Sequence, residues 1–166
     1  MALVILEGLD RTGKTTVAKY LASKGYEIIH MSAPTKGTTP DLFLEEMVTL
    51  ISRAATSNIC LDRSYYGEAC IWPQVYNRES LLSEDNLEVL REIENSVDTT
   101  RILMVDPKVE EHWKRCVDNN EPLTKAQFLK ARALYNQMST KYDFEQTSLT
   151  AFIKENPEAE EFAVQA

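Results

Sequence analysis

The chain has 166 residues, of which 43% are hydrophobic, and its formal net charge is −8. A chain of this length can bury about 70% of its unfolded surface, so we expect a single domain over residues 1–166. The acidic balance, with no Lys/Arg cluster outside a glycine-rich N-terminal segment, argues against DNA or RNA as a partner.

The cysteines and the apolar runs indicate in which cellular compartment the protein is expected. The 3 cysteines are odd in number and lack C-x-x-C spacing, which is typical of a reducing environment. The apolar run 2–6 is too short for a signal peptide, and no run is long enough to cross a bilayer. We therefore expect a cytoplasmic protein with no membrane partner, and a homodimer is left open.

The most specific pattern lies at the N-terminus. Residues 2–6 are typical of a buried parallel strand, residues 8–15 match G-x-x-x-x-G-K-[ST], and a helix is predicted over 14–24. Such a loop directs backbone N–H groups at phosphate oxygens. We expect Lys14 to reach the β- and γ-phosphates of ATP and Thr15 to bind Mg²⁺, although the loop alone does not distinguish ATP from GTP. The expected nucleotide-binding residues are Gly8, Leu9, Asp10, Arg11, Thr12, Gly13, Lys14, Thr15 and Thr16.

The rest of the chain alternates between strands and helices. Further strands are predicted at 26–31, 58–61 and 102–105, with a weaker one at 147–153. Helices are predicted from a cap at Asp41 to about 51, in part over 65–76 with a break at Pro73, and at 80–95, 106–116 and 124–141. This order predicts a three-layer α/β fold of the P-loop NTPase type, with a five-stranded parallel sheet and ligands at the carboxyl ends of the strands.

A second cluster of polar residues follows the predicted strand 58–61. Asp62 is placed to hold a Mg²⁺-bound water, and Arg63 offers a planar set of donors that matches a phosphate. The alternative interpretation is a surface ion pair that ends the strand. His30 and His112 have no partners at ligand spacing, so we expect neither to bind a metal.

Three segments resemble the thymidylate kinase family. They are residues 6–16 (Leu-Glu-Gly-Leu-Asp-Arg-Thr-Gly-Lys-Thr-Thr), residues 62–64 (Asp-Arg-Ser) and residues 103–109 (Leu-Met-Val-Asp-Pro-Lys-Val). The resemblance implies a nucleoside monophosphate kinase fold and transfer of the ATP γ-phosphoryl group to a deoxypyrimidine monophosphate such as dTMP. The chain is shorter than typical members, which is consistent with a trimmed viral or otherwise divergent version that would act in the host cytoplasm.

The resemblance also implies roles for single residues. Asp10 matches an acid that contacts the sugar-hydroxyl side of the acceptor, and Arg63 matches the arginine that holds the acceptor monophosphate. Arg11 matches an arginine that stabilises charge on the transferred phosphoryl group. The expected catalytic residues are therefore Arg11, Lys14 and Arg63, and the expected metal-binding residues are Thr15 and Asp62.

The sequence departs from the family around the acceptor site. Typical members carry Arg-Glu-Pro after the second strand, whereas residues 32–37 read Ser-Ala-Pro-Thr-Lys-Gly, so Lys36 is the candidate cation. Phe43 is a candidate to stack on the base, although it fits the core face of a helix equally well. Tyr66 and Glu68 replace a serine-containing run and are candidates to read a base or a sugar.

The lid is expected at 114–123, after the helix that follows the fourth strand. Arg115 is the only arginine there. It is a candidate to contact ATP, and its alternative role is that of a plain charge at a helix end. A lid with a single arginine is consistent with Arg11 as the catalytic cation.

A deoxynucleoside kinase is the first alternative function. It would need a general base close to the acceptor hydroxyl. Residues 32–39, where its relatives place a carboxylate, contain no acid and do contain Lys36. A monophosphate acceptor is already ionised and needs only cations, so the sequence favours a monophosphate kinase.

A GTP-dependent switch is less favoured. Residues 140–143 resemble the guanine-reading [NT]-K-x-D pattern, but they lie at a predicted helix end, and no D-x-x-G begins at Asp62. A binding module without catalysis would leave Arg11 and Arg63 without a purpose.

Overall fold

A five-stranded sheet forms the centre of the computed structural model, which describes residues 1–163. The strand order is β2-β3-β1-β4-β5, and every neighbouring pair is parallel. The strands are β1 (Ala2–Glu7), β2 (Glu27–His30), β3 (Ile59–Asp62), β4 (Asp98–Met104) and β5 (Glu145–Thr147). The predicted α/β fold with a five-stranded parallel sheet is confirmed.

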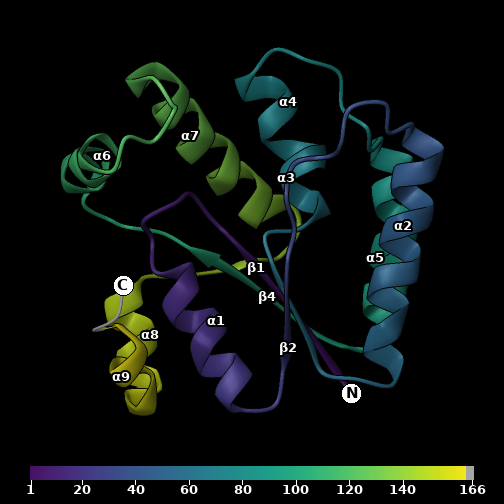
Figure 1. Cartoon of the computed structure of the whole chain (residues 1–166), viewed down its shortest axis with the longest axis horizontal. Coiled ribbons are helices and arrows are strands. Elements are labelled where there is room, and N and C mark those ends of the chain that lie inside the picture. The colour runs from purple at the N-terminus through teal and green to yellow at the C-terminus, as the bar shows by residue number, and fades with distance from the viewer. Residues whose placement is uncertain (164–166) are drawn as a thin grey trace.

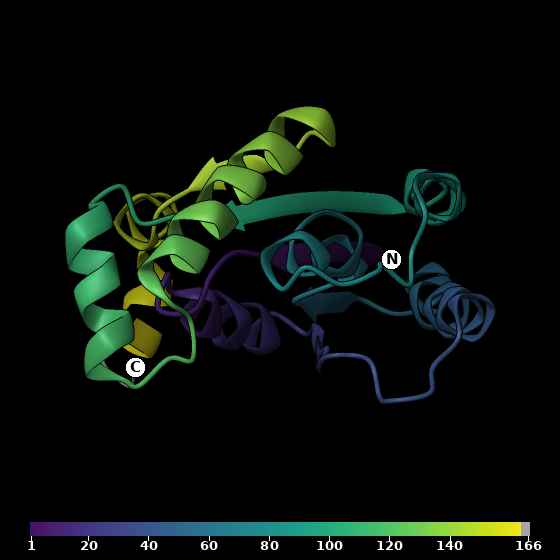
Figure 2. The same cartoon turned by 90° about the horizontal axis from the view of Figure 1, so that it is seen from above.

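Helices cover both faces of this sheet (Figures 1 and 2). On one face lie α1 (Lys14–Ser23), α8 (Leu149–Glu155), η2 (Pro157–Ala159) and α9 (Glu160–Ala163). The other elements are α2 (Pro40–Ser52), η1 (Arg53–Ala55), α3 (Tyr65–Cys70), α4 (Trp72–Val75), α5 (Glu84–Asn95), α6 (Val109–Asp118) and α7 (Lys125–Lys141). Within residues 1–163, no helix combines the length and the apolar character needed to span a bilayer.

Strand β1 contributes to a core on each face of the sheet. Leu3 and Ile5 belong to the larger core, which lies against α2, α3, α5 and α7, whereas Val4 and Leu6 belong to the smaller core against α1 and α8. This split follows from the two-residue period of a strand. Because both faces are covered, β1 reads as a continuous apolar run.

The C-terminal part differs from the prediction. The strand predicted at 147–153 is wrong in its bounds, because β5 ends at Thr147 and residues 149–155 form α8. The Ser148 hydroxyl accepts a hydrogen bond from the Ala151 N–H at 3.1 Å and so caps that helix. A cap of this kind ends the extended chain and starts a helix within one residue.

Several predicted boundaries shift for the same local reasons. The cap of α2 is Thr39 rather than Asp41, and Pro40 takes the first helical position. Residues 65–76 do form two short helices, but the break falls at Ile71, because Pro73 sits in the first turn of α4, where its missing N–H costs little. The first half of the predicted lid, 114–123, belongs to α6, because that helix extends to Asp118.

Candidate functional site

The segment between β1 and α1 has the backbone of a phosphate loop. Gly8 and Gly13 have φ angles of 140° and 99°, which side-chain-bearing residues rarely adopt. A Cβ on Gly8 would lie 2.5 Å from the Met104 carbonyl oxygen, so this glycine also permits close approach to the end of β4. The loop leads directly into the N-terminus of α1, where backbone N–H groups are free to bind an anion.

A hollow of about 340 Å³ opens over this loop. Its lining consists of Asp10, Arg11, Gly13, Lys14, Thr15, Thr16 and Glu121. Thr15 is exposed there, whereas Thr16 is buried. Six of the nine loop residues expected to hold the nucleotide therefore line one space, and Glu121 joins them from the segment after α6.

Lys14 lies under the loop with only 7% of its surface exposed. Its ammonium donates to the carbonyl oxygens of Gly8 and Leu9. Burial, and next the positive charge of Arg63, lower the pKa of Lys14 from its ordinary value to about 8, although nearby carboxylates oppose the shift. The lysine is thus fixed at the centre of the loop in a site from which water is largely excluded.

Arg63 and Asp10 form an ion pair beside the loop. Arg63 follows β3 with a φ of 67°, and its N–H donates to the Leu6 carbonyl at 2.9 Å, which ties this residue to β1. Burial raises the pKa of the Asp10 carboxyl, but the charges of Arg63 and Lys14 outweigh it, so the pKa is lowered. Asp10 is therefore ionised, and it orients the arginine that was expected to hold a phosphate.

Glu7, the last residue of β1, holds the backbone next to Arg63. Its carboxylate is buried and accepts hydrogen bonds from the Ser64 N–H at 2.6 Å, the Ser64 hydroxyl at 2.9 Å and the Tyr135 hydroxyl at 3.2 Å. Burial raises the pKa of Glu7, although the charge of Lys14 opposes the shift. These bonds fix the position of the residue that follows Arg63.

Asp62 and Thr15 have the oxygen donors that a magnesium ion prefers. Asp62 is buried; its Oδ2 pairs with His30 Nδ1 at 3.0 Å, while its Oδ1 is buried without a partner among residues 1–163. The same holds for the Thr16 hydroxyl. Within the described residues, no group of three His, Cys, Asp or Glu side chains could hold a metal alone. These donors fit a Mg²⁺ ion that also takes oxygens from phosphate and water.

A second cavity, of about 320 Å³, lies next to the loop. Its wall carries the aromatic side chains Phe43, Trp72 and Tyr76, and the rings of Trp72 and Tyr76 stack at 5.8 Å. Charged and polar groups are set around them: Asp10, Arg63, Ser64, Glu68, Arg78 and Glu121. A largely apolar cleft with a few placed polar groups is typical of a small-molecule site.

The predicted acceptor residues separate into two groups. Asp10, Phe43, Arg63 and Glu68 all line this cavity. Tyr66 is the clear correction, because it is fully buried on the other side of α3, where its hydroxyl donates to Glu94. Lys36 is exposed on the loop before α2 and does not line the cavity. The structure therefore does not place its ammonium in the predicted acceptor site.

The segment around the predicted lid contacts the phosphate loop. Arg11 Nε lies 3.3 Å from a carboxylate oxygen of Glu121, and Arg115 Nη2 donates to the Arg11 carbonyl at 3.0 Å. Arg115 also pairs with Asp106. Arg115 is thus more than a free charge at a helix end: it joins α6 to the backbone of the loop.

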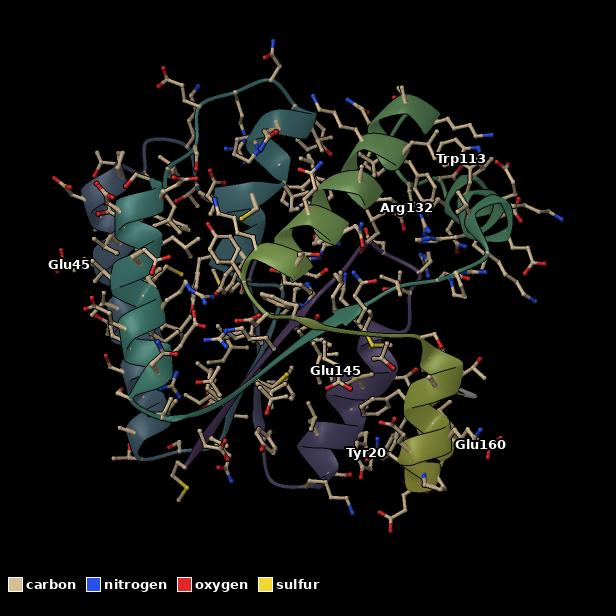
Figure 3. The ribbon with its side chains drawn as sticks, turned by 180° about the vertical axis from the view of Figure 1, so that it is seen from behind. Tyr20, Glu45, Trp113, Arg132, Glu145 and Glu160 are labelled. Carbon is tan, nitrogen blue, oxygen red and sulfur yellow. The ribbon has the colours of Figure 1, made fainter. Side chains whose placement is uncertain are left out.

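A further cluster behind the loop was not found from the sequence. His112 Nε2 lies 2.8 Å from the Asp10 carbonyl oxygen, and Arg132 Nη1 lies 3.3 Å from His112 Nδ1. Figure 3 places Arg132 on α7 and Trp113 on α6 at the same end of the molecule. A cavity of about 260 Å³ lined by both His112 and Arg132 adjoins the loop there. The available signal was a lone histidine in a helix after the fourth strand, and it did not identify a partner.

Comparisons with known proteins bear on the fold. No family model and no curated protein matches the chain. The solved structure of the YorR protein from Bacillus subtilis, in complex with phosphorylated GDP, matches with a TM-score of 0.69 and 23% identity over 99% of this chain and 98% of that one. The structure of APE1195 matches with a TM-score of 0.42 and 17% identity over 84% of this chain and 95% of that one. YorR therefore shares its fold with this chain over nearly the full length of both.

Proposed function

We propose that this chain is an ATP-dependent nucleoside monophosphate kinase of the thymidylate kinase type, which transfers the γ-phosphoryl group of ATP to a deoxypyrimidine monophosphate such as dTMP. The observation that carries the proposal is the juxtaposition of two spaces. The hollow over the phosphate loop and the aromatic cavity share two lining residues, Asp10 and Glu121. A donor in the first space and an acceptor in the second would meet at that boundary.

The charged residues have the distribution that phosphoryl transfer needs. Lys14 and the loop N–H groups would hold the β- and γ-phosphates, and Arg63 would hold the acceptor phosphate from the cavity side. Arg11 would leave Glu121 to stabilise charge on the transferred group. Positioning of two phosphates under these cations is the main part of such catalysis.

Mg²⁺ would be held by Thr15 and, through water, by Asp62, and it would neutralise charge on the phosphates. The Oδ1 of Asp62, which is buried without a partner in the described part of the chain, supports this assignment. Of known proteins, YorR shares the fold and was solved with phosphorylated GDP. That complex supports a nucleotide ligand for this chain without specifying its base.

The paired state of the carboxylates favours a monophosphate acceptor over a free nucleoside. A nucleoside kinase needs an acid that is available as a base. Among the described residues, two acids of the aromatic cavity are each held by an arginine, Asp10 by Arg63 and Glu68 by Arg78. A GTP switch receives less support, because Lys141 pairs with Glu84 at the far end of α7.

The test is ADP release with ATP·Mg²⁺ and a panel of acceptors. The panel holds dTMP, dUMP, dCMP, dGMP, dAMP, GMP and the free nucleosides. Turnover on a deoxypyrimidine monophosphate is the expected result. Turnover on free nucleosides alone would overturn the proposal in favour of a nucleoside kinase. No turnover with any acceptor, together with tight GTP binding, would favour the switch.

A further inference from the structure

The aromatic cavity contains an ion pair that the sequence did not predict. Glu68 is only 5% exposed, and its two carboxylate oxygens accept hydrogen bonds from Nη1 and Nη2 of Arg78 at 2.9 and 2.8 Å. The Leu81 N–H donates to the same carboxylate at 2.9 Å, and the Ser80 hydroxyl donates to the Glu68 carbonyl at 2.9 Å. The segment between α4 and α5 therefore folds back on α3 and holds the guanidinium in one orientation.

The hydrogen bonds of Arg78 leave one edge of its guanidinium free. Nη1 uses its second proton on the Glu79 carbonyl at 3.2 Å. Within residues 1–163, the Nε–H and the outer N–H of Nη2 have no acceptor. These two groups lie side by side on the planar guanidinium, and both are donors only. Arg78 lines the cavity together with the stacked rings of Trp72 and Tyr76.

We propose that Arg78, held by Glu68, selects the base of the acceptor by accepting keto bases and rejecting amino bases. The inference deepens the proposed function and rests on it. Guanine and thymine present a carbonyl oxygen where adenine and cytosine present an amino group. A donor edge binds the carbonyl oxygen, whereas an amino group would face it donor to donor and leave both groups without partners. Arg78 therefore favours the monophosphates of thymine, uracil and guanine over those of cytosine and adenine as phosphoryl acceptors.

The experiment compares bases of equal ring size. We expect kcat/KM for dTMP to exceed that for dCMP, and kcat/KM for dGMP to exceed that for dAMP, by about 10- to 100-fold each. Arg78→Lys keeps a cation beside Glu68 but lacks the second edge of donors, so both ratios should fall toward one through loss of the keto substrates. Arg78→Met should do the same. The matched control is Arg53→Met, which removes an exposed arginine paired with Glu27 and should leave both ratios unchanged.

A binding readout separates this inference from the proposed function. Trp72 lines the cavity, so its fluorescence reports dGMP and dAMP binding without ATP. If the wild type turns over both members of a pair equally, or if Arg78→Lys retains the wild-type ratios, the inference is wrong although the kinase survives. If no monophosphate is turned over, the kinase proposal fails, but a dGMP affinity that Arg78→Lys weakens at least tenfold more than the dAMP affinity would still support the selection. Melting curves of both variants identify any loss of folding, and Arg78→Lys is the variant that decides.

Discussion

Arg11 lines the hollow over the phosphate loop and pairs with Glu121, one of the two residues that this hollow shares with the aromatic cavity. It has a φ of 64°, and 45% of its side chain is exposed, so little packing holds it in place. Among residues 1–163 its one ion pair is to Glu121, and an exposed pair of this kind contributes little stability. The side chain is therefore free to exchange Glu121 for a phosphate at small cost.

If Arg11 stabilises the transferred phosphoryl group, Arg11→Ala should lower kcat by about 10³-fold or more. Its effect on ATP affinity should be small, because Lys14 and the loop N–H groups remain. Rapid-quench turnover gives the first value and titration with a non-hydrolysable ATP analogue gives the second. Arg11→Lys serves as the comparison, since it retains charge without the planar donors and should lose less activity. A fully active Arg11→Ala enzyme would exclude Arg11 from catalysis.

Side chains of α6 and α7 hold the backbone of the phosphate loop through His112. Arg132 can only donate, so His112 Nδ1 accepts from it, and the ring proton lies on Nε2, which donates to the Asp10 carbonyl. Arg132 also donates to the Asp106 carbonyl at 2.9 Å. His112 is fully buried in this arrangement. A neutral histidine thus links two helices to the loop.

The surroundings of His112 oppose its protonation. Burial lowers its pKa most, and the cations Arg115 and Arg132 add to this, whereas the Asp10 carbonyl and Asp106 oppose them. Because the folded-state pKa lies below its ordinary value of 6.5, the unfolded chain binds a proton that the folded chain lacks as the pH falls below 6.5. This group therefore contributes a loss of stability toward acid pH.

We expect His112→Gln to reduce that acid sensitivity. Glutamine can still donate an N–H to the Asp10 carbonyl, but it does not titrate. Its stability at pH 8 should stay within about 1 kcal/mol of the wild type, and its stability should decline less between pH 7 and pH 5. Urea unfolding over this pH range measures both quantities. His112→Phe, which loses the donor, should instead weaken ATP binding at every pH. An unchanged pH slope in His112→Gln would contradict this account.

Across the molecule, features set by local sequence spacing could be predicted, whereas pairings between side chains of different segments could not. The glycine loop between β1 and α1 could be located because its glycines and lysine are recognised by spacing alone, and Asp62 and Arg63 could be placed beside it because they end a buried strand. Their binding roles stay predictions. The far wall of the cavity was missed, since Arg78 belongs to it only through its pairing with Glu68, ten residues earlier in the chain. Tyr66 was misplaced because a short helix after Arg63 gives no periodicity that tells its two faces apart.

The true surroundings of Tyr66 form a buried polar network that joins three elements. Glu94 of α5 is fully buried and accepts from the hydroxyls of Tyr65 and Tyr66 on α3 and from Arg101 Nε of β4 at 2.7 Å. Arg101 is only 12% exposed on its side chain. None of these residues lines the two spaces of the proposed site. The network therefore ties the outer helices to the sheet and is separate from the chemistry.

Removal of this buried carboxylate should destabilise the fold and spare the activity of the molecules that remain folded. Glu94→Leu leaves a buried guanidinium and two hydroxyls without an acceptor, so we expect a loss of about 3–5 kcal/mol in the free energy of unfolding. Glu94→Gln keeps an acceptor and should lose about 1–3 kcal/mol. Glu92→Gln, an exposed change on the same helix, is the control and should stay within about 0.5 kcal/mol. Urea unfolding gives all three values.

The double variant Glu94→Leu/Arg101→Met tests how much of the loss comes from the ion pair. Because a buried ion pair is costly to desolvate, the double variant should recover part of the stability lost in Glu94→Leu. An equal loss in the single and double variants would mean that the hydroxyl bonds, not the ion pair, dominate the network.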